Sequence, residues 1–482
     1  MQHLDLGARW SPEELGIKVA AQPNSFWLDS GLSHRRYGRY SFFGWDPFLV
    51  VRSEGRRVSV ISEGRERTVA ANPFELLKEL LAAYRLPPQP ELPPLWAGAV
   101  GYFGYDLCRH LERLPRTVAD DLNLPDLWLG FYDRVLVYDH RYGRATVFST
   151  GLPAPDGVAR RRRARQRLEE ARAVLEAPPP GGGASARPEP GPITIGSNFR
   201  PEDYVRAVAR AREYIFAGDI FQVNLTQRFE APLTTDPLSL YLRLRRLNPA
   251  PYAAYLNPPG MAVASSSPER FLCLRGRRVE TRPIKGTRPR GTDPASDRAL
   301  KRELWASEKD RAELAMIVDL ERNDLGRTCE IGSVRVQRLY CLETYATVFH
   351  LVATVVGTLA PDRDFLDCLA GCFPGGSITG APKIRAMEII DELETVSRGV
   401  YTGAIGYVSF TGEAADLNIA IRTMVIKGDR VYFGAGGGIV ADSVPELEYE
   451  ESVTKARALM AAVQGGVRTA GEGSGVYGVG LG

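Results

Sequence analysis

Hydrophobic and polar residues alternate over two long stretches of the chain, and this pattern predicts β-strands. Up to about residue 150, runs such as RYSFFGWDPFLVVRS and RVLVYDHRYGRATVFS are separated by Gly, Asp-Pro and charged turns. Near the other end, YTGAIGYVSF and LNIAIRTMVIKGDRVYFGAGGGIV, with a turn at Gly428 and Asp429, predict three consecutive strands of one antiparallel meander.

Apolar residues at helical spacing occur between these blocks. The segment NPFELLKELLAAYRL begins with Asn72 and Pro73, a typical cap and first-turn pair. A second helix is predicted from Pro201 to about Gly218, with a buried stripe of Tyr204, Val208, Ala211 and Ile215. Because helices and hairpins come in separate blocks, the pattern predicts an α+β fold rather than a parallel doubly wound sheet.

Composition changes sharply once, in the Pro- and Gly-rich stretch from Pro178 to Pro192. We therefore divide the 482 residues into an N-terminal α+β region (1–150), a charged helix and linker (151–192), a second folded region (193–464) and a Gly-rich tail (465–482) expected to be disordered. The Arg/Glu-rich stretch from Arg160 to Glu176 predicts a solvated helix, and nucleic-acid binding by its arginines is the rarer alternative.

Charge and apolar content narrow the class of protein. Hydrophobic residues make up 44% and charged residues 25%, and the net charge is only +3, so nothing suggests a partner that is nucleic acid or membrane. The chain has neither a run of about 18 apolar residues nor the pattern of a signal peptide at Met1. We expect a soluble, cytoplasmic protein whose six cysteines are reduced thiols rather than zinc ligands.

Two glycine clusters, FPGGSITGAPK and GAGGGIV, could in principle bind a phosphate group. Neither matches a nucleotide-binding motif, because Ala381 stands where a P-loop has lysine and Ile439 stands where a dinucleotide fingerprint has glycine. The first cluster leads into a helix near Pro382, whose amides could hold a carboxylate. A simple tight turn explains the same residues equally well.

A second candidate group is acidic. Glu313 lies in SEKDRAELAMIVDLERND, while Glu448, Glu451 and Lys455 fall on one stripe of a later predicted helix. Such residues are usually solvated, but they could also form a site for Mg²⁺, which binds a few carboxylates together with substrate and water.

A third group lies in ASSSPERFLCLRGRRVETRPIKGTRPRG, which predicts a hairpin with its turn at Arg275 and Gly276. Glu269 and Lys285 would then be on neighbouring strands and could face one pocket. Exposed charges on a surface sheet are the alternative.

Several ordered blocks resemble the chorismate-utilising enzymes. They are SSSPERFLCLRG, PIKGTRPRG, MIVDLERNDLG, FPGGSITGAPKIRAMEIID and GYVSFTG, which run from about residue 195 to 460. The N-terminal FWLDSGLSHRRYGRYSFFGWDP also resembles the large components of anthranilate synthase and aminodeoxychorismate synthase. The resemblance implies two packed antiparallel β-sheets with flanking helices, and an N-terminal region intertwined with the chorismate-binding region.

The resemblance also implies roles for matched residues. Lys285 would be a nucleophile, Glu269 a general acid and His350 an active-site histidine. Glu313 and Glu451 would hold Mg²⁺, with Glu448 as an auxiliary ligand. Substrate would be bound by Gln222, Thr287, Tyr401, Arg422, Lys455 and the amides of Gly436, Gly437 and Gly438.

Lys285 separates two members of that family. Anthranilate synthases usually have alanine in the third position of the PIxGT block, whereas lysine is characteristic of aminodeoxychorismate synthase component I. In that enzyme the lysine attacks C2 of chorismate, and ammonia then attacks C4. Addition of water is disfavoured by the resemblance, because Gln222 occupies the position of the water-activating lysine in isochorismate synthases.

The resulting hypothesis is an aminodeoxychorismate synthase large component, acting in 4-aminobenzoate and folate synthesis. Its ammonia would come from glutamine through a separate amidotransferase subunit, since no such domain is recognisable in the chain. The alternative is anthranilate synthase component I. That enzyme binds tryptophan near a Leu-Leu-Glu-Ser segment, which Trp27, Leu28, Asp29 and Ser30 match only in part. A purely non-enzymatic role is disfavoured.

Overall fold

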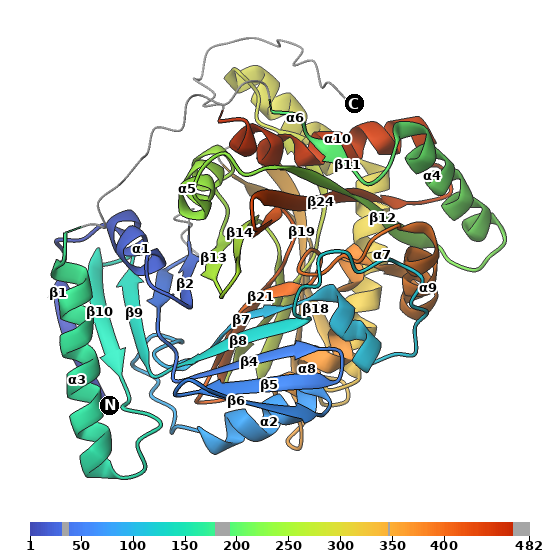
Figure 1. The fold of residues 1–482 in the computed structure, drawn as a ribbon. Helices are drawn as coiled ribbons and strands as arrows, with labels where there is room; N and C mark the ends of the chain where they lie inside the picture. Colours follow the sequence, from blue (N-terminus) through green and yellow to red (C-terminus); the bar gives the residue numbers. More distant parts are fainter. Residues whose placement is uncertain (31–37, 179–192, 346–347, 466–482) are drawn as a thin grey trace.

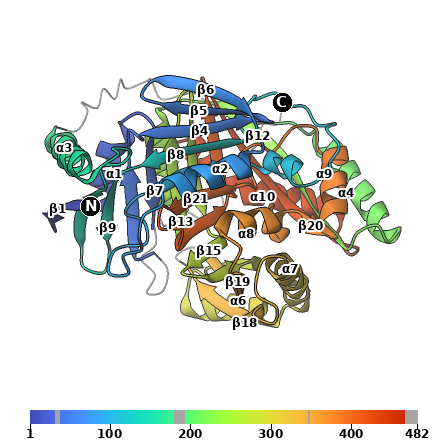
Figure 2. The same cartoon turned by 90° about the horizontal axis from the view of Figure 1, so that it is seen from below.

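The computed structural model describes residues 1–30, 38–178, 193–345 and 348–465. Within these ranges the strands form two antiparallel sheets of 12 strands each. Helices lie outside the sheets, as Figures 1 and 2 show from two directions. The predicted α+β class with two packed antiparallel sheets is confirmed. Nearly all of the predicted Pro- and Gly-rich linker (178–192) and of the predicted tail (465–482) lies outside the described residues.

The first sheet has the strand order β1 (Gln2–Gly7), β10 (Arg144–Ser149), β9 (Arg134–Asp139), β3 (Tyr40–Gly44), β2 (Ser25–Asp29), β13 (Tyr252–Asn257), β14 (Met261–Ser267), β23 (Thr423–Lys427), β24 (Arg430–Ile439), β12 (Gln222–Pro232) and β11 (Gly196–Ser197), with β20 (Gly380–Ala381) also paired to β12.

The second sheet has the order β17 (Ile284–Pro289), β19 (Val348–Thr358), β16 (Arg278–Arg282), β15 (Arg270–Arg275), β22 (Ala414–Ile419), β21 (Ala404–Ser409), β7 (Gly98–Phe103), β8 (Leu127–Tyr132), β4 (Leu49–Glu54), β5 (Arg57–Ser62) and β6 (Arg65–Ala70), with β18 (Arg335–Thr344) paired to β19. Each sheet therefore contains strands from both ends of the chain, and the two regions are intertwined.

The helices are α1 (Pro12–Ala20), α2 (Pro73–Ala83), α3 (Gly157–Glu176), α4 (Pro201–Phe216), α5 (Pro237–Leu247), α6 (Pro294–Ala306), α7 (Glu308–Gly326), α8 (Phe365–Cys372), α9 (Lys383–Leu393) and α10 (Pro445–Val463), with short 3₁₀ turns η1 (Tyr105–His110) and η2 (Gly376–Ile378). The predicted cap of α2 is confirmed, since the side chain of Asn72 accepts a hydrogen bond from the amide of Phe74. Helix α4 also begins at Pro201 as predicted. Among the described residues, no helix is long and apolar enough to cross a bilayer.

The alternation of strand side chains builds two hydrophobic clusters. Phe26 of β2 points into the cluster between the sheets, whereas its neighbour Trp27 joins a second cluster under the outer helices. The sheets meet directly where the rings of Phe42 and Tyr407 lie 5.5 Å apart. The sheets thus bury one face on each other, and the first sheet covers its outer face with helices.

The predicted three-stranded meander near the C-terminus is wrong both in the number of strands and in placing them in one sheet. The segment forms four strands, of which β21 and β22 pair in the second sheet while β23 and β24 pair in the first. The chain crosses between the sheets at residues 420–422, where Arg422 has a positive φ of 53°. Alternation of side chains predicts strands but does not specify which sheet a strand joins.

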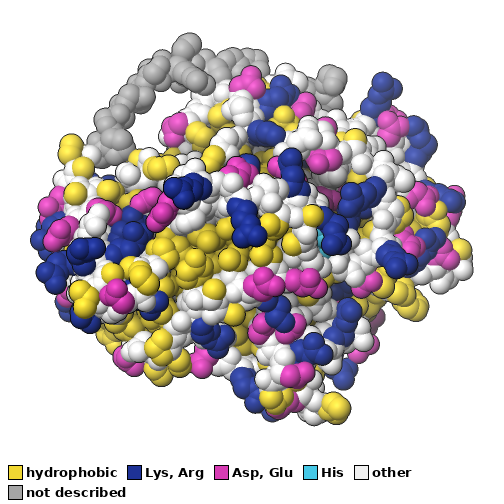
Figure 3. Space-filling view, turned by 60° about the horizontal axis from the view of Figure 1, so that its bottom comes forward, with side chains coloured by type: hydrophobic (Ala, Val, Ile, Leu, Met, Phe, Trp, Pro, Cys, Tyr) yellow, Lys and Arg dark blue, Asp and Glu magenta, His cyan; other side chains and the backbone are white. Residues whose placement is uncertain are grey.

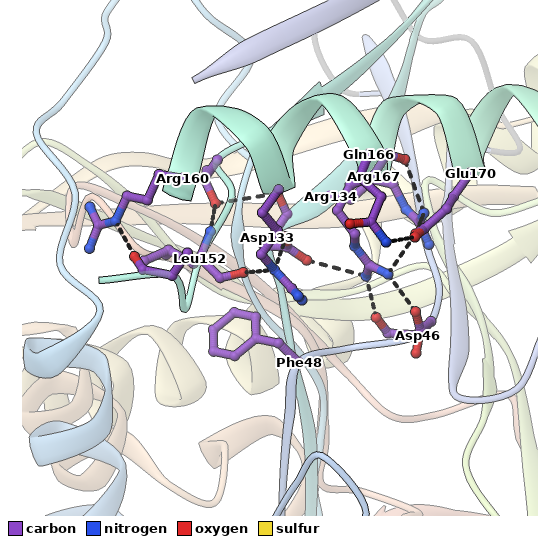
Figure 4. A network of polar contacts seen from close by, with 12 residues as sticks. Asp46, Phe48, Asp133, Arg134, Leu152, Arg160, Gln166, Arg167 and Glu170 are labelled. Atoms are coloured by element: carbon purple, nitrogen blue, oxygen red, sulfur yellow. Dashed lines mark hydrogen bonds and ion pairs between the residues drawn. The ribbon is translucent and has the colours of Figure 1, made fainter. Parts of the chain in front are cut away.

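Helix α3 confirms the predicted charged helix but is not fully solvated. Arg167 is only 6% exposed and reaches Asp133 at 3.2 Å and Asp46 at 2.5 Å. Arg134 beside it bonds to the carbonyl of Arg167, as Figure 4 shows. These paired charges connect α3 to Asp46, Asp133 and Arg134 in the first part of the chain. Elsewhere on the surface, charges of both signs are mixed with apolar side chains, as on the face in Figure 3.

Candidate active site

Glu269 and Lys285 lie just beyond the paired residues of the predicted hairpin. β15 and β16 form that hairpin, with Gly276 at a φ of 60° in its turn. Lys285, however, belongs to β17 rather than to β16. β16 and β17 follow one another along β19, with Thr281 of β16 opposite Val355 and Ile284 of β17 opposite Val352. The strand assignment of Lys285 is therefore corrected, although its nearness to Glu269 is as predicted.

Glu269 is a buried acid. Its side chain is 4% exposed, and burial raises its pKa from 4.5 to about 7. Ser377, Lys285 and the backbone of Ile284 each act to lower this pKa and so oppose the shift. A carboxyl with this pKa can release a proton to a substrate at neutral pH.

Lys285 has the complementary property. Burial lowers the pKa of its amine, against the opposing influence of Glu313, while the positive charge of Lys455 lowers it further. The residue as a whole is only partly buried, so its desolvated amine is not sealed inside the core. A lysine amine in such a setting loses its proton more readily and can act as a nucleophile.

Three consecutive glycines of β24, Gly436, Gly437 and Gly438, let other groups approach both faces of that strand closely. A Cβ built on Gly438 would overlap the amide nitrogen of Gln222 and lie 3.4 Å from Lys285 Nζ. On Gly437, which faces α10, a Cβ would lie 3.0 Å from Glu448 Oε2 and 3.7 Å from Glu451 Oε1. Glycine is thus required here because several polar side chains approach the backbone closely.

The acidic stripe of α10 is present as predicted. Lys455 Nζ lies 2.7 Å from Glu451 Oε1 and donates to the carbonyl of Gly436 at 2.9 Å. Although burial acts to raise the pKa of Glu451, Lys455 lowers it overall. Glu448 accepts a hydrogen bond of 2.6 Å from Ser443, and burial raises its pKa.

Glu313 of α7 lies near enough to Glu451 of α10 and to Lys285 for their charges to influence it. Burial raises its pKa, and Lys285, Lys309 and Glu451 all act on it electrostatically. In the part of the chain that the structure describes, no three His, Cys, Asp or Glu side chains are placed to hold a metal ion by themselves. The donors nevertheless suit Mg²⁺, because Glu448 and Glu451 approach Gly437 and Glu313 interacts electrostatically with Glu451, and a substrate carboxylate could complete such a site.

His350 and Thr287 are paired across β19 and β17. Thr287 Oγ1 lies 2.9 Å from His350 Nδ1, and burial lowers the pKa of the histidine to about 4, with a smaller contribution from Arg422. His350 is therefore neutral at neutral pH, so its imidazole can donate or accept a hydrogen bond but carries no charge.

Tyr401 and Arg422 flank the crossover between the sheets. The ring of Tyr401 covers Gly434 so closely that a Cβ there would overlap it. Thr402 and Arg422 both have positive φ angles, of 61° and 53°, which is unusual for residues with a Cβ. Burial lowers the pKa of Arg422. Strained backbone of this kind is common at binding sites.

The N-terminal segment lines a different cavity, of about 260 Å³, that also contacts β15, β21 and β22. Asp29 and Ser30 border it. The Asp29 carboxylate is already bound by Arg245 Nε at 2.5 Å and by Ser41 Oγ at 3.1 Å. In the segment that partly matches a tryptophan-binding segment, the acid Asp29 is therefore already paired with Arg245 and its charge is neutralised.

Other polar residues of the site were not found from the sequence. Ser443 donates a hydrogen bond to Glu448, Lys309 lies 4.0 Å from Glu313, and Ser377 acts to lower the pKa of Glu269. Ser377 belongs to the glycine cluster that we considered as an anion loop. Only the folded structure shows that it faces Glu269, because these residues are more than 100 positions apart.

Comparison with known proteins identifies the family. The protein-family model described as chorismate binding enzyme matches residues 24–461 of this chain. The chain belongs to the chorismate-binding enzyme family.

Curated members of this family are similar over almost the whole chain. Anthranilate synthase component 1 of Acetivibrio thermocellus is 43% identical over 446 residues, covering 91% of this chain and 90% of that protein. The Thermus thermophilus protein of the same name is also 43% identical, with 94% and 95% covered.

Among solved structures, anthranilate synthase component I from Streptococcus pneumoniae is 33% identical with a TM-score of 0.76, covering 88% of this chain and 92% of that one. The fold is thus that of anthranilate synthase component I, as the sequence resemblance implied. The names of these relatives favour the alternative function, anthranilate synthase, over the leading one.

Proposed function

We propose that this protein forms 4-amino-4-deoxychorismate from chorismate and ammonia. The observation that carries the proposal is Lys285. Its amine has a lowered pKa, lies 3.4 Å from the Cβ position of Gly438, and interacts with the buried acid Glu269. An amine that only stabilised the fold would gain most by being charged and paired, whereas this one is desolvated beside the space that the β24 glycines leave.

The proposed reaction uses both groups. The neutral amine of Lys285 attacks C2 of chorismate while the bond between C4 and its hydroxyl breaks. Glu269 gives its proton to that hydroxyl, which leaves as water. Ammonia then attacks C4 and expels the Lys285 amine, so the lysine is regenerated and the product leaves with an ammonium group at C4.

The remaining candidate residues would bind and orient the substrate. Arg422, Tyr401, Thr287 and the glycine amides of β24 would meet its carboxylates, and neutral His350 would hydrogen-bond to it. Glu313 and Glu451, assisted by Glu448, would hold Mg²⁺, which when bound withdraws electron density through the ring carboxylate. Lys455 now neutralises Glu451 at 2.7 Å, which supports weak metal binding before substrate arrives.

Ammonia would come from a second subunit. The relatives named component 1 imply such a partner in their own systems. We propose a glutamine amidotransferase for this chain too, with free ammonium replacing it in vitro.

A second candidate function is anthranilate synthase component I. The similarity to enzymes of that name favours it. In that reaction ammonia attacks C2 directly and pyruvate is later eliminated, so Lys285 would not become attached to the substrate.

The decisive experiment is product analysis together with mass spectrometry of the intact protein. Incubated with chorismate, ammonium and Mg²⁺, the enzyme should form aminodeoxychorismate and no pyruvate. Incubated with chorismate and Mg²⁺ alone, it should gain the mass of chorismate less one water, and Lys285→Ala should not. Anthranilate and pyruvate formed at the same rate by both proteins would refute the proposal in favour of the second candidate.

A further inference from the structure

Arg398 is a buried cation that joins separate parts of the chain. Its side chain is 2% exposed, and every N–H donor of its guanidinium group has an acceptor. Nε and Nη2 donate to the two oxygens of Glu394 at 2.9 and 2.6 Å. The remaining donors bind the carbonyl of Asn224 at 2.7 Å, the carbonyl of Ile378 at 2.9 Å and the hydroxyl of Thr402 at 3.4 Å. An arginine used so completely fixes the relative positions of the segments that it joins.

Glu394 neutralises this arginine and binds β12 as well. Its side chain is 4% exposed. Besides Arg398, its Oε1 accepts hydrogen bonds from the amide and the hydroxyl of Thr226, at 2.9 and 2.8 Å. Both charges are thus hydrogen-bonded, as a buried ion pair requires. Because Asn224 and Thr226 both belong to β12, the pair fastens that strand at two points.

The turn beside Arg398 carries the candidate substrate-binding residue Tyr401. The next residue, Thr402, is 1% exposed and has a φ of 61°, which residues with a Cβ rarely adopt. Its amide donates to the carbonyl of Ala420 at 3.0 Å, and its hydroxyl donates to the carbonyl of Tyr401 at 2.6 Å. The amide of Tyr401 donates to the carbonyl of Arg398 at 3.1 Å. Such a conformation persists only where its surroundings enforce it, and Arg398 holds this turn through both its side chain and its backbone.

This turn directs the ring of Tyr401 onto β24. A Cβ built on Gly434 would overlap that ring, so the ring lies directly against the strand. Gly438 lies four residues further along the same face, or about 13 Å away, and there a Cβ would lie 3.4 Å from Lys285 Nζ. Burial raises the pKa of Tyr401 to about 12, so its hydroxyl remains a hydrogen-bond donor at neutral pH. Tyr401 and Lys285 therefore approach one face of β24 at two points.

We propose that Arg398 is a positioning residue for Tyr401. It holds the turn at Thr402 in the conformation that points the Tyr401 hydroxyl at the substrate, and Glu394 holds Arg398 in turn. Arg398 acts through Tyr401 rather than on the substrate, because its own donors are taken up by the protein. The inference rests on the proposed function only in requiring that Tyr401 binds chorismate, which is the substrate of both candidate reactions.

Arg398→Lys tests this role, because lysine keeps the charge beside Glu394 but lacks the planar group that reaches the other acceptors. Its KM for chorismate should rise about tenfold, as expected for loss of one hydrogen bond to a charged group, with kcat within about threefold of wild type. Tyr401→Phe should raise KM by a similar factor. Because both substitutions remove the same interaction, adding Tyr401→Phe to Arg398→Lys should raise KM less than about twofold further.

Arg109→Lys is the matched control. Arg109 is also largely buried and paired with a buried carboxylate, that of Asp391 in α9. The control protein should lose stability in urea unfolding, as Arg398→Lys should, but its KM for chorismate should stay within about twofold of wild type. An equal rise of KM in the two proteins would show that Arg398 only supports the structure.

Two other results would overturn the proposal. An unchanged KM in Arg398→Lys would show that the turn does not depend on the arginine, and full multiplication of the two KM effects in the double variant would show that it does not act through Tyr401. If Arg398→Lys does not fold, Thr402→Val and Thr402→Ser decide. Valine removes the hydroxyl that Arg398 binds and should raise KM, whereas serine keeps it and should not; equal KM values for the two would contradict the proposal.

Product analysis of the same reactions separates this inference from the proposed function. Anthranilate as the wild-type product would refute aminodeoxychorismate synthesis but leave the comparison of KM values valid. An unchanged KM in Tyr401→Phe would refute the positioning role alone, whichever product is formed.

Discussion

Replacing Glu269 by glutamine should make the protein less active but more stable at alkaline pH. The acid is 4% exposed and its pKa is about 7, against 4.5 for an ordinary glutamate side chain. In the unfolded chain the group ionises above pH 4.5, whereas in the folded protein it keeps its proton until about pH 7. Folding therefore works against ionisation of this residue throughout that interval.

The size of the effect follows from the shift. A raised pKa contributes stability that is complete below pH 4.5 and is lost as the pH rises to about 7. A difference of about 2.5 units corresponds to about 3 kcal/mol. The glutamine side chain cannot ionise, so the Glu269→Gln variant avoids this loss. At pH 5 the wild-type protein has lost less than about 1 kcal/mol of this stability, whereas at pH 8 the loss is complete. The stability of the variant relative to wild type should therefore be about 2 kcal/mol greater at pH 8 than at pH 5.

Urea unfolding of both proteins at pH 5 and pH 8 measures this difference. Glu450→Gln, which removes an exposed carboxylate from α10, is the matched control and should change the two values equally. The same Glu269→Gln protein should lose about 10²–10⁴-fold in turnover, since it has no proton for the leaving hydroxyl. A stability difference that is the same at both pH values would show that Glu269 is not held protonated in the fold, and the reasoning would fail.

Three further predictions concern the rest of the site. Glu451→Gln should raise the Mg²⁺ concentration needed for half-maximal activity about tenfold, whereas the exposed Glu446→Gln on the same helix should not; equal Mg²⁺ dependence would exclude Glu451 as a ligand. Gly438→Ala should abolish turnover with the fold intact by circular dichroism, because its methyl would displace Gln222; normal kinetics would contradict that geometry. Tryptophan should inhibit only weakly, since the Asp29 carboxylate is already bound, and inhibition at micromolar concentration would favour the anthranilate synthase alternative.

Local features of this fold could be predicted from the sequence, but their partners could not. The cap at Asn72 and the start of α4 at Pro201 depend on a few adjacent residues, and both were predicted correctly. The division of the C-terminal strands between two sheets depends on a reversal near Arg422, a residue type that rarely takes a positive φ. No alternation of side chains could reveal that reversal.

The candidate site shows the same contrast. The family resemblance pointed to Lys285 and Glu269 without showing how either is tuned. Their pKa shifts come from burial, which requires the assembled sheets. Ser377, which influences the pKa of Glu269, was missed because a serine in a Gly-rich loop carries no pattern of its own.

The interleaving of strands has a consequence for dividing the gene. β2 pairs with β13, and β7 pairs with β21, so each half of the polypeptide supplies a bonding edge for the other. A fragment ending near residue 150, or one starting near residue 200, would expose unpaired strand edges and aggregate when produced alone. Co-expressed, the two pieces should refold into one active complex, which makes this scaffold suited to split-protein complementation.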